Sequence, residues 1–520
     1  MFAAALLCAQ LAHVKLHQAR VESAAVVQAG AFLPAGADPH KPEADAYKKL
    51  PEFCRVTITS TPSSDSRIAV EVWLPLADWN HKFRGQGNGG FAGSIDYRGM
   101  AGSLRLGYAT AGSDAGHKGE ATDASWALGH PEKVIDFGYR AVHEMTGDAK
   151  TVIAAFYGEP AQKNYFDSCS DGGREALMEA QRFPADYDGI LAGAPANYWT
   201  HLLTAGLALQ KVVLAGPATY IPLSKIPLIE QAVLNTCDAL DGSKDGVVMD
   251  QERCRFHPSV LLCKGAESDS CLTAPQVHSL EAIYTGAKDS HGQLIFPPIM
   301  PGSEAGDSGW KYWVTGESYG TAEGLKYPEG FFRNMVYEDR SWDFKTANVD
   351  RALADADKKL AHVLNATDPD LSAFEKRGGK LILYHGWLDA AISPLNTIDY
   401  YNSVVAKMGA PKANQFVRLY MLPGVQHCAG GPGPFIFGQL GISHKRDRAH
   451  NAFVTLEDWV EKGTPPGAIV ATKLNDDRDP SKGVKMERPL CAYPQNAVYD
   501  GSGDASQADS FSCKESSLSR

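Results

Sequence analysis

Short apolar runs separated by helical patterns constrain the fold of this chain more than any other feature. Four such runs lie at 106–111, 165–168, 189–191 and 380–385, of which the second ends in Ser168 and the fourth in His385, and a fifth at 417–422 ends before Pro423. Buried parallel strands have this nearly continuous apolar character because both of their faces are covered. Between two runs, residues 173–183 place Ala176, Leu177 and Ala180 on one helical face. This alternation predicts an α/β fold with right-handed crossovers.

The stretch from 198 to 377 interrupts the alternation. It contains two pairs of cysteines, an acidic loop and segments rich in Gly and aromatic residues, such as GWKYWVTGESYG. We interpret 198–377 as an inserted lid domain. It separates a first core segment at 1–197 from a second at 378–520, which ends in a Ser-rich tail.

Charge and hydropathy restrict the partners of the protein. The formal net charge is −11, and 44% of the 520 residues are apolar. An acidic chain is not expected to bind nucleic acid or an anionic membrane as its main partner. No apolar run approaches the roughly 18 residues of a membrane-spanning helix. The beginning, MFAAALLCAQ, has no basic segment, and we interpret it as the start of a mature or trimmed domain. The sequence leaves the oligomeric state open.

The 10 cysteines form an even set in which neighbours along the chain suggest partners. Three pairs bracket short segments: Cys237 with Cys254, Cys263 with Cys271, and Cys491 with Cys513. Cys8 and Cys54 remain for the N-terminal segment, which leaves Cys169 and Cys428. No spacing is typical of zinc. Five disulfides would place the protein in the periplasm or outside the cell; the alternative is a cytosolic protein with buried free thiols.

The segment YFDSCSDGG has the pattern of a nucleophile elbow. A strand precedes Ser170, and a helix follows it. A sharp strand-to-helix turn lifts a serine Oγ above the sheet, and small residues permit the turn. Ser168 stands where G-x-S-x-G has its first glycine. The alternative is an ordinary glycine-containing loop with an incidental serine.

Chain order supplies an acid and a base for Ser170. In α/β-hydrolases the acid and then the histidine follow the serine along the chain. Asp389 comes directly after the run at 380–385, and His427 follows the run at 417–422. His427 would accept the serine proton while Asp389 fixes the imidazole tautomer. Asp114 is a competing acid, but it precedes the serine.

A glycine-rich loop, GQGNGG at 85–90, is the candidate for half of an oxyanion hole. Such a hole needs two backbone N–H donors. We predict the amide of Asp171 as one donor and that of Gly90 as the other, with Gly89 as the alternative. The loop also matches G-x-G-x-x-G, but no amphipathic helix follows, so a dinucleotide site is not favoured.

The acidic loop CDALDGSKDGVV at 237–248 is a candidate metal site. Carboxylate and carbonyl oxygens are the ligands that calcium prefers. The expected ligands are three side chains and two backbone carbonyls: Asp238, Asp241 and Asp245, with Ser243 and Val247. A disulfide between Cys237 and Cys254 would close the loop before metal binds. The alternative is a solvated acidic turn without metal.

Taken together, CSDGG, YHGWLDAAISP, HCAGGPG and CDALDGSKDGV resemble the tannase and feruloyl esterase family, which includes a terephthalate-monoester hydrolase. The resemblance covers nearly the whole chain. It implies an α/β-hydrolase fold with a large lid, a catalytic Ser170, Asp389 and His427, and a disulfide between Cys169 and Cys428. It also implies structural calcium on the acidic loop, small aromatic esters as substrates and no organic cofactor.

The resemblance also suggests a substrate pocket. Its expected residues are His385, Trp387 and Ile392 on the acyl side and Trp313, Tyr327 and Phe331 from the lid. Terephthalate-type relatives have an arginine four residues before a phenylalanine; here Tyr327 precedes Phe331, with Lys326 and Arg333 as possible substitutes. A feruloyl-type substrate is therefore favoured, with a galloyl ester or a terephthalate monoester as alternatives. A calcium-stabilised binding module on an inactive hydrolase scaffold is the alternative of a different class.

Overall fold

The computed structural model describes residues 2–249 and 251–515 and divides into two compact units. Unit 1 comprises Met1–Ala192 and Asp370–Lys380, and unit 2 comprises Gly193–Pro369 and Leu381–Arg520. The predicted insertion at 198–377 falls almost wholly in unit 2, together with the segments that carry Asp389 and His427. Its role as a lid stays a prediction.

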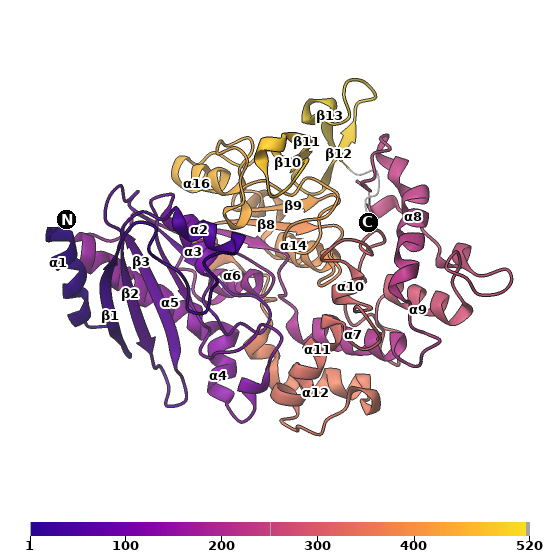
Figure 1. Cartoon of the computed structure of the whole chain (residues 1–520), viewed down its shortest axis with the longest axis horizontal. Coiled ribbons are helices and arrows are strands. Elements are labelled where there is room, and N and C mark those ends of the chain that lie inside the picture. The colour runs from indigo at the N-terminus through magenta and orange to yellow at the C-terminus, as the bar shows by residue number, and fades with distance from the viewer. Residues whose placement is uncertain (1, 250, 516–520) are drawn as a thin grey trace. The chain divides into compact units, whose positions relative to one another are not determined.

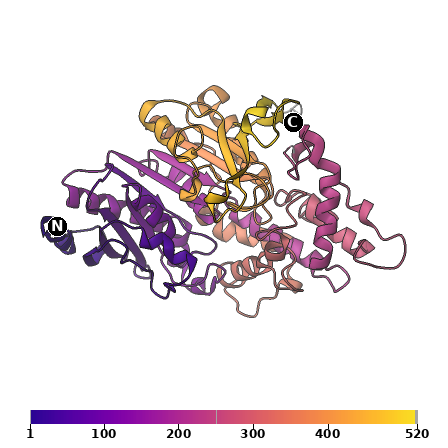
Figure 2. The same cartoon turned by 45° about the horizontal axis from the view of Figure 1, so that its top comes forward.

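Unit 1 is built on a sheet in which the strand order is β1-β2-β3-β5-β4-β6-β7. The strands are β1 (Ala19–Val27), β2 (Phe53–Ser60), β3 (Ile68–Pro75), β4 (Lys82–Gln86), β5 (Ala109–Ser113), β6 (Lys163–Cys169) and β7 (Gly189–Gly193). The first three are antiparallel and lie side by side in both ribbon views (Figures 1 and 2). Strand β4 lies between β5 and β6 and is parallel to both.

The parallel part of this sheet is buried as its sequence predicts. All residues of β5 and β7 are buried, and so are the last five of β6. Strand β5 begins later than the predicted 106, because Leu106 and Gly107 still donate hydrogen bonds to the preceding helix α3. The helices of unit 1 are α1 (Phe2–Gln10), α2 (Asp45–Lys48), α3 (Tyr97–Leu104), α4 (Pro131–Ile135), α5 (Ala141–Tyr157), α6 (Asp171–Arg182) and α13 (Ser372–Lys376).

Unit 2 contains a parallel strand pair and two small antiparallel sheets. The pair is β8 (Lys380–Gly386) with β9 (Val417–Leu422), and the small sheets are β10 (Ile469–Leu474) with β11 (Val484–Leu490) and β12 (Gln495–Tyr499) with β13 (Phe511–Glu515). Its helices are α7 (Trp199–Val213), α8 (Ile226–Cys237), α9 (Ala274–Thr285), α10 (Trp310–Trp313), α11 (Glu323–Gly330), α12 (Val349–Leu364), α14 (Pro394–Met408), α15 (Ala410–Ala413) and α16 (Ala452–Lys462). Strands that alternate with helices in this way confirm the predicted α/β class.

All 10 cysteines are disulfide-bonded. Four predicted bridges are present, Cys8–Cys54, Cys237–Cys254, Cys263–Cys271 and Cys491–Cys513, with Cα–Cα distances of 4.9–5.7 Å. Cys169 and Cys428 are also bonded; their pairing with each other stays a prediction. A bridge that closes a loop stabilises a protein chiefly by restricting the unfolded chain.

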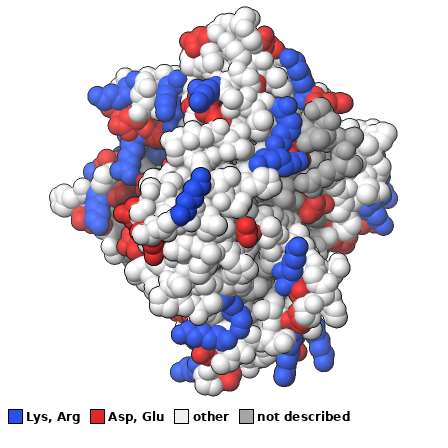
Figure 3. Space-filling view, turned by 90° about the vertical axis from the view of Figure 1, so that its right-hand side faces the viewer, with Lys and Arg blue, Asp and Glu red and all other residues white. Residues whose placement is uncertain are grey.

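Acidic and basic side chains are mixed on the face drawn in Figure 3, and neither sign forms a continuous patch among its described residues. Within the described part of the chain, no helix combines the length and the apolar character needed to cross a bilayer.

Candidate active site

Ser170 occupies the turn between β6 and α6. Its backbone has φ 68° and ψ −123°, a strained conformation for a residue with a side chain. The turn also requires a glycine at 172, since a Cβ there would lie 1.9 Å from Ser168 Oγ and 2.8 Å from the carbonyl oxygen of Asn88. Ser168 itself is accommodated in this elbow and is buried. A strained residue between a strand and a helix, with small neighbours, is the backbone arrangement expected of a nucleophile elbow.

The glycine-rich loop after β4 is attached to α6 through Asn88. The carbonyl of Asn88 accepts the N–H of Gly172 at 2.8 Å, and its own N–H donates to Glu175 Oε2 at 2.8 Å. Among the described residues, the N–H groups of Gly90 and Asp171 have no hydrogen-bond acceptor. Two such amides, one on the loop and one directly after the serine, are the donors that the sequence predicts for an oxyanion hole.

Glu175 is a functional candidate that the sequence did not reveal. It is fully buried on α6, and its carboxyl connects this helix to the glycine-rich loop. Burial raises the pKa of Glu175 to about 8, with a further contribution from the nearby charge of Asp171. Nothing in the local pattern separates this glutamate from a solvated one, because its partner lies 87 positions away.

We expect the stability of the Glu175→Gln variant, relative to the native protein, to rise with pH. The folded native protein holds a proton on Glu175 between pH 4.5 and about 8 that the unfolded chain releases, so native stability falls as pH rises through this window. Glutamine keeps an acceptor for Asn88 and does not ionise. Urea unfolding at pH 5 and pH 8 measures how much the free energy of unfolding of the variant changes relative to that of the native protein, on the order of 1–3 kcal/mol.

The control is Glu175→Leu, which leaves the N–H of Asn88 without an acceptor and should lower stability at both pH values. A pH-independent difference for Glu175→Gln would contradict the assignment.

Asp389 and His427 form a hydrogen-bonded acid–base pair in unit 2. Asp389 lies in the turn after β8, and His427 lies in the loop after β9. Oδ2 of Asp389 is 2.7 Å from His427 Nδ1, and Oδ1 accepts the N–H groups of Ala391 and Ile392. Burial raises the pKa of Asp389, but the charge of His427 and hydrogen bonds from His385 and His427 outweigh burial and hold the pKa well below its usual range. A carboxylate held in this way can orient an imidazole and stabilise its protonated form.

Part of the predicted insertion contacts this pair. The Trp313 ring lies edge-on to the His427 imidazole, with centroids 5.3 Å apart, and Tyr327 stacks on Trp313 at 6.0 Å. Both rings are partly exposed. The side chain of Gln426, next to His427, donates to the carbonyl of Ala305 at 2.6 Å. An aromatic surface therefore stands beside the candidate base.

The other predicted pocket residues are buried. Phe331, Trp387 and Ile392 are at most 4% exposed. His385 has no exposed surface and bonds to Asp389 rather than presenting a ring to a ligand. In this structure, only Trp313 and Tyr327 among the six predicted pocket residues offer accessible aromatic surface.

The competing acid, Asp114, has a structural role in unit 1. Its carboxylate accepts the N–H groups of Ala69 and Gly116 at 2.9 and 3.0 Å. Burial raises the pKa of Asp114 to about 6. These bonds tie the end of β5 to β3.

The acidic loop in unit 2 has a donor set suited to a divalent cation. Asp238 and Asp241 are buried, burial raises the pKa of Asp241 to about 6, and Asp241 Oδ2 has no hydrogen-bond partner among the described residues. Asp245 pairs with the buried Arg488. Three carboxylates against one guanidinium leave an excess of negative charge that a cation would neutralise. Within the described chain, no group of three or more His, Cys, Asp or Glu side chains is already arranged around a common point.

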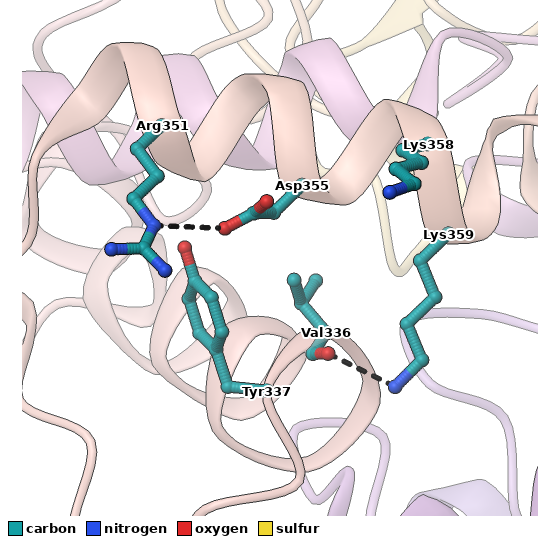
Figure 4. A pocket seen from close by; sticks show the side chains of 6 residues that line it. All are labelled: Val336, Tyr337, Arg351, Asp355, Lys358 and Lys359. Carbon is teal, nitrogen blue, oxygen red and sulfur yellow. Dashed lines mark hydrogen bonds and ion pairs between the residues drawn. The ribbon is translucent and has the colours of Figure 1, made fainter.

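A surface groove of about 450 Å³ lies between α12 and the turn that follows the π-helical segment η9 (Phe331–Val336). Figure 4 shows Arg351 paired with Asp355 at 3.4 Å and Lys359 Nζ donating to the carbonyl of Val336 at 2.9 Å. Lys359 also pairs with Glu338 at 2.6 Å. The residues that line it are Val336, Tyr337, Arg351, Asp355, Lys358 and Lys359. None of them belongs to the predicted catalytic set.

Known proteins resemble this chain over nearly its whole length. Residues 54–514 match the profile of the family described as tannase and feruloyl esterase. An uncharacterized esterase of Xanthomonas campestris pv. campestris is 42% identical over 98% of this chain and 91% of its own length. A probable feruloyl esterase B-1 of Aspergillus flavus is 32% identical over 89% of this chain and 86% of its own.

Solved structures show the same likeness. The crystal structure of feruloyl esterase B from Aspergillus oryzae superimposes with a TM-score of 0.88 at 30% identity, covering 98% of this chain and 100% of the other. The tannin acyl hydrolase from Aspergillus niger gives a TM-score of 0.76 at 23% identity, covering 98% and 95%, and shows the fold alone.

Proposed function

The chain belongs to the tannase and feruloyl esterase family, and we propose that it is a serine carboxylesterase acting on esters of aromatic acids of the feruloyl type. The observation that carries this proposal is the buried Asp389 bonded to His427 at 2.7 Å beside the ring of Trp313. The strained Ser170 at the end of β6 supports it independently. The two fungal relatives named as feruloyl esterases, at 32% and 30% identity, support the feruloyl assignment.

In the proposed reaction, Ser170 Oγ attacks the ester carbonyl carbon while His427 Nε2 takes the hydroxyl proton. The carbonyl oxygen becomes an oxyanion, which the N–H groups of Asp171 and Gly90 stabilise. Collapse of this intermediate breaks the bond to the alcohol oxygen, and His427 returns the proton to that oxygen. A water molecule, deprotonated by His427, then releases the acid from the acyl-enzyme. These steps need no organic cofactor.

The proposal includes a bridge between Cys169 and Cys428, which adjoin the nucleophile and the base in sequence. Both cysteines are oxidised. A disulfide confines the Cα atoms that it joins to about 4.4–6.8 Å, so it would hold two catalytic residues together covalently. Ten oxidised cysteines also favour a periplasmic or extracellular location.

A hydrolysis panel tests the substrate class. Methyl ferulate, methyl gallate and a terephthalate monoester are compared by kcat/KM, and we expect methyl ferulate to give the largest value. Tyr327 offers a ring and a phenol in place of the arginine that would bind a free carboxylate, which disfavours the terephthalate monoester. A higher kcat/KM for methyl gallate or for the monoester would replace the feruloyl assignment with that alternative.

We further propose that Asp238, Asp241 and Asp245, with the carbonyls of Ser243 and Val247, hold a structural calcium ion. The ion would neutralise the excess carboxylate charge and tie the loop between Cys237 and Cys254. It takes no part in the ester chemistry. The orphaned oxygen of Asp241 supports this assignment.

We expect removal of calcium to lower the Tm of the protein, and we expect addition of calcium to restore the Tm. A ligand that binds only the folded state stabilises it by about 2.7 kcal/mol at a hundredfold excess over its Kd. Calorimetry after chelation, with calcium or magnesium added back, measures the effect. Asp241→Asn should weaken the response to calcium, whereas Asp339→Asn, on an exposed turn, serves as a control. A Tm that is unaffected by chelation would exclude the ion.

A further inference from the structure

His385 binds the same carboxylate oxygen as His427. Its Nε2 lies 3.0 Å from Asp389 Oδ2 and 3.1 Å from the carbonyl oxygen of Ile392, and its Nδ1 lies 2.7 Å from Thr397 Oγ1. The imidazole belongs to a residue of β8 and has no exposed surface. Two histidines therefore share Asp389, one that is accessible and one that is buried.

The surroundings of His385 select one tautomer. Nε2 faces only acceptors, a carboxylate and a carbonyl, so it must carry a proton. Nδ1 faces the Thr397 hydroxyl, which can donate to it and complete a neutral ring. The chain of hydrogen bonds runs from Thr397 through His385 to Asp389 and then to His427.

We propose that His385 is a positioning residue that sets the proton affinity of His427 through Asp389. The Nε2–H of His385 donates to Asp389 Oδ2, which makes this oxygen a weaker acceptor for His427. The same bond fixes the plane of the carboxylate and so orients it toward His427. Among the described residues, the titratable groups that act on Asp389 are these two histidines. Around them, α14 contributes Thr397, and α10 contributes Trp313, neither of which ionises near neutral pH.

Substitution at 385 separates this role from packing. His385→Phe keeps a ring of similar shape but has no donor, and His385→Gln returns a donor near the Nε2 position. Thr397→Val removes the hydroxyl without changing the shape of the side chain. Thr455→Val, in α16, is the matched control, because its buried hydroxyl bonds only to backbone carbonyls of its own segment.

We expect the His385→Phe substitution to raise the pKa of His427 by about half to one unit. The Asp389 carboxylate loses a hydrogen-bond donor in this variant and therefore attracts the proton of His427 more strongly. ¹⁵N-histidine NMR follows the titration of His427 and the Nδ1–H proton directly, whether or not the chain hydrolyses an ester. Thr397→Val should shift the pKa in the same direction by less, and His385→Gln should bring it back toward the native value. An unchanged titration in His385→Phe would overturn the proposal.

The kinetic expectation rests on the proposed function. His385→Phe should lower kcat by about 10- to 100-fold with KM nearly unchanged, and it should move the acidic limb of the kcat/KM profile to higher pH. His385→Gln should recover most of kcat, and Thr455→Val should behave as the native protein. If His385→Phe lowered the Tm without shifting the pH profile of kcat/KM, the role of His385 would be limited to packing. If the native protein hydrolyses no ester, the proposed function fails, and the NMR titration still decides the role of His385.

Discussion

Replacing Ser170 with alanine is expected to abolish ester hydrolysis, with kcat lowered by about 10⁵- to 10⁶-fold. In serine hydrolases, removal of the nucleophile alone costs about as much as removal of the whole triad. A fluorophosphonate probe, which reacts with an activated serine, should label the native protein stoichiometrically and leave the variant unlabelled. Mass spectrometry of the labelled peptide identifies the site.

A matched control is Ser60→Ala, which removes a buried serine hydroxyl on β2 that has no hydrogen-bond partner among the described residues. It should label and hydrolyse as the native protein does. Relief of backbone strain at 170 is not expected, because alanine also carries a Cβ. A native chain that never labels would favour the calcium-stabilised binding module over the enzyme, and labelling that survives in Ser170→Ala would place the nucleophile elsewhere.

For Asp389→Asn, we expect kcat to fall by about 10⁴-fold near neutral pH. The amide has to place either its oxygen or its NH₂ group toward His427 Nδ1 and His385 Nε2, and without the charge it no longer favours the protonated His427. The site would keep its shape and lose the correct tautomer. Steady-state kinetics from pH 5 to 9 measures the loss, and the structure of the variant checks the shape.

The same variant has a defined pH dependence of stability. Because the pKa of Asp389 in the folded protein is lowered from 3.8, its contribution is present in full above about pH 4 and is lost as pH falls below that value. Asp389→Asn should therefore be less stable than the native protein at pH 7, with a smaller difference at pH 3. Asp114→Asn is the control: it changes a buried acid of unit 1, and its kcat should stay within a few-fold of the native value. If Asp114→Asn lowered kcat more than Asp389→Asn does, Asp114 rather than Asp389 would be the catalytic acid.

Local patterns predicted the secondary structure around the candidate site. Strands at 163–169, 380–386 and 417–422 begin or end within two residues of the predicted runs, and α6 follows Ser170 as expected. These elements follow from short-range rules, namely burial on both faces of a strand and the periodicity of a helix. The beginning of β5 was predicted too early, because Leu106 is apolar and yet belongs to the turn after α3.

The interactions that hold the site together could not be predicted in this way. The bond between Glu175 and Asn88 spans 87 positions, and an isolated glutamate in a helical pattern is normally assigned to solvent. His385 was predicted, from the family resemblance, to line the acyl side of a substrate pocket. Its actual partners, Asp389 and Thr397, depend on how the turn after β8 and the start of α14 fold back on that strand.

The sequence by itself determined the α/β class, the positions of Ser170, Asp389 and His427 at strand ends, and four cysteine pairs. Each of these depends on residues close together along the chain or on their order. Only the tertiary structure decided which buried polar groups satisfy one another: Glu175 with the glycine-rich loop, and His385 with the acid. The physical reason is that a buried polar group needs a partner, and the identity of that partner is set by the packing of distant segments, which no local pattern encodes.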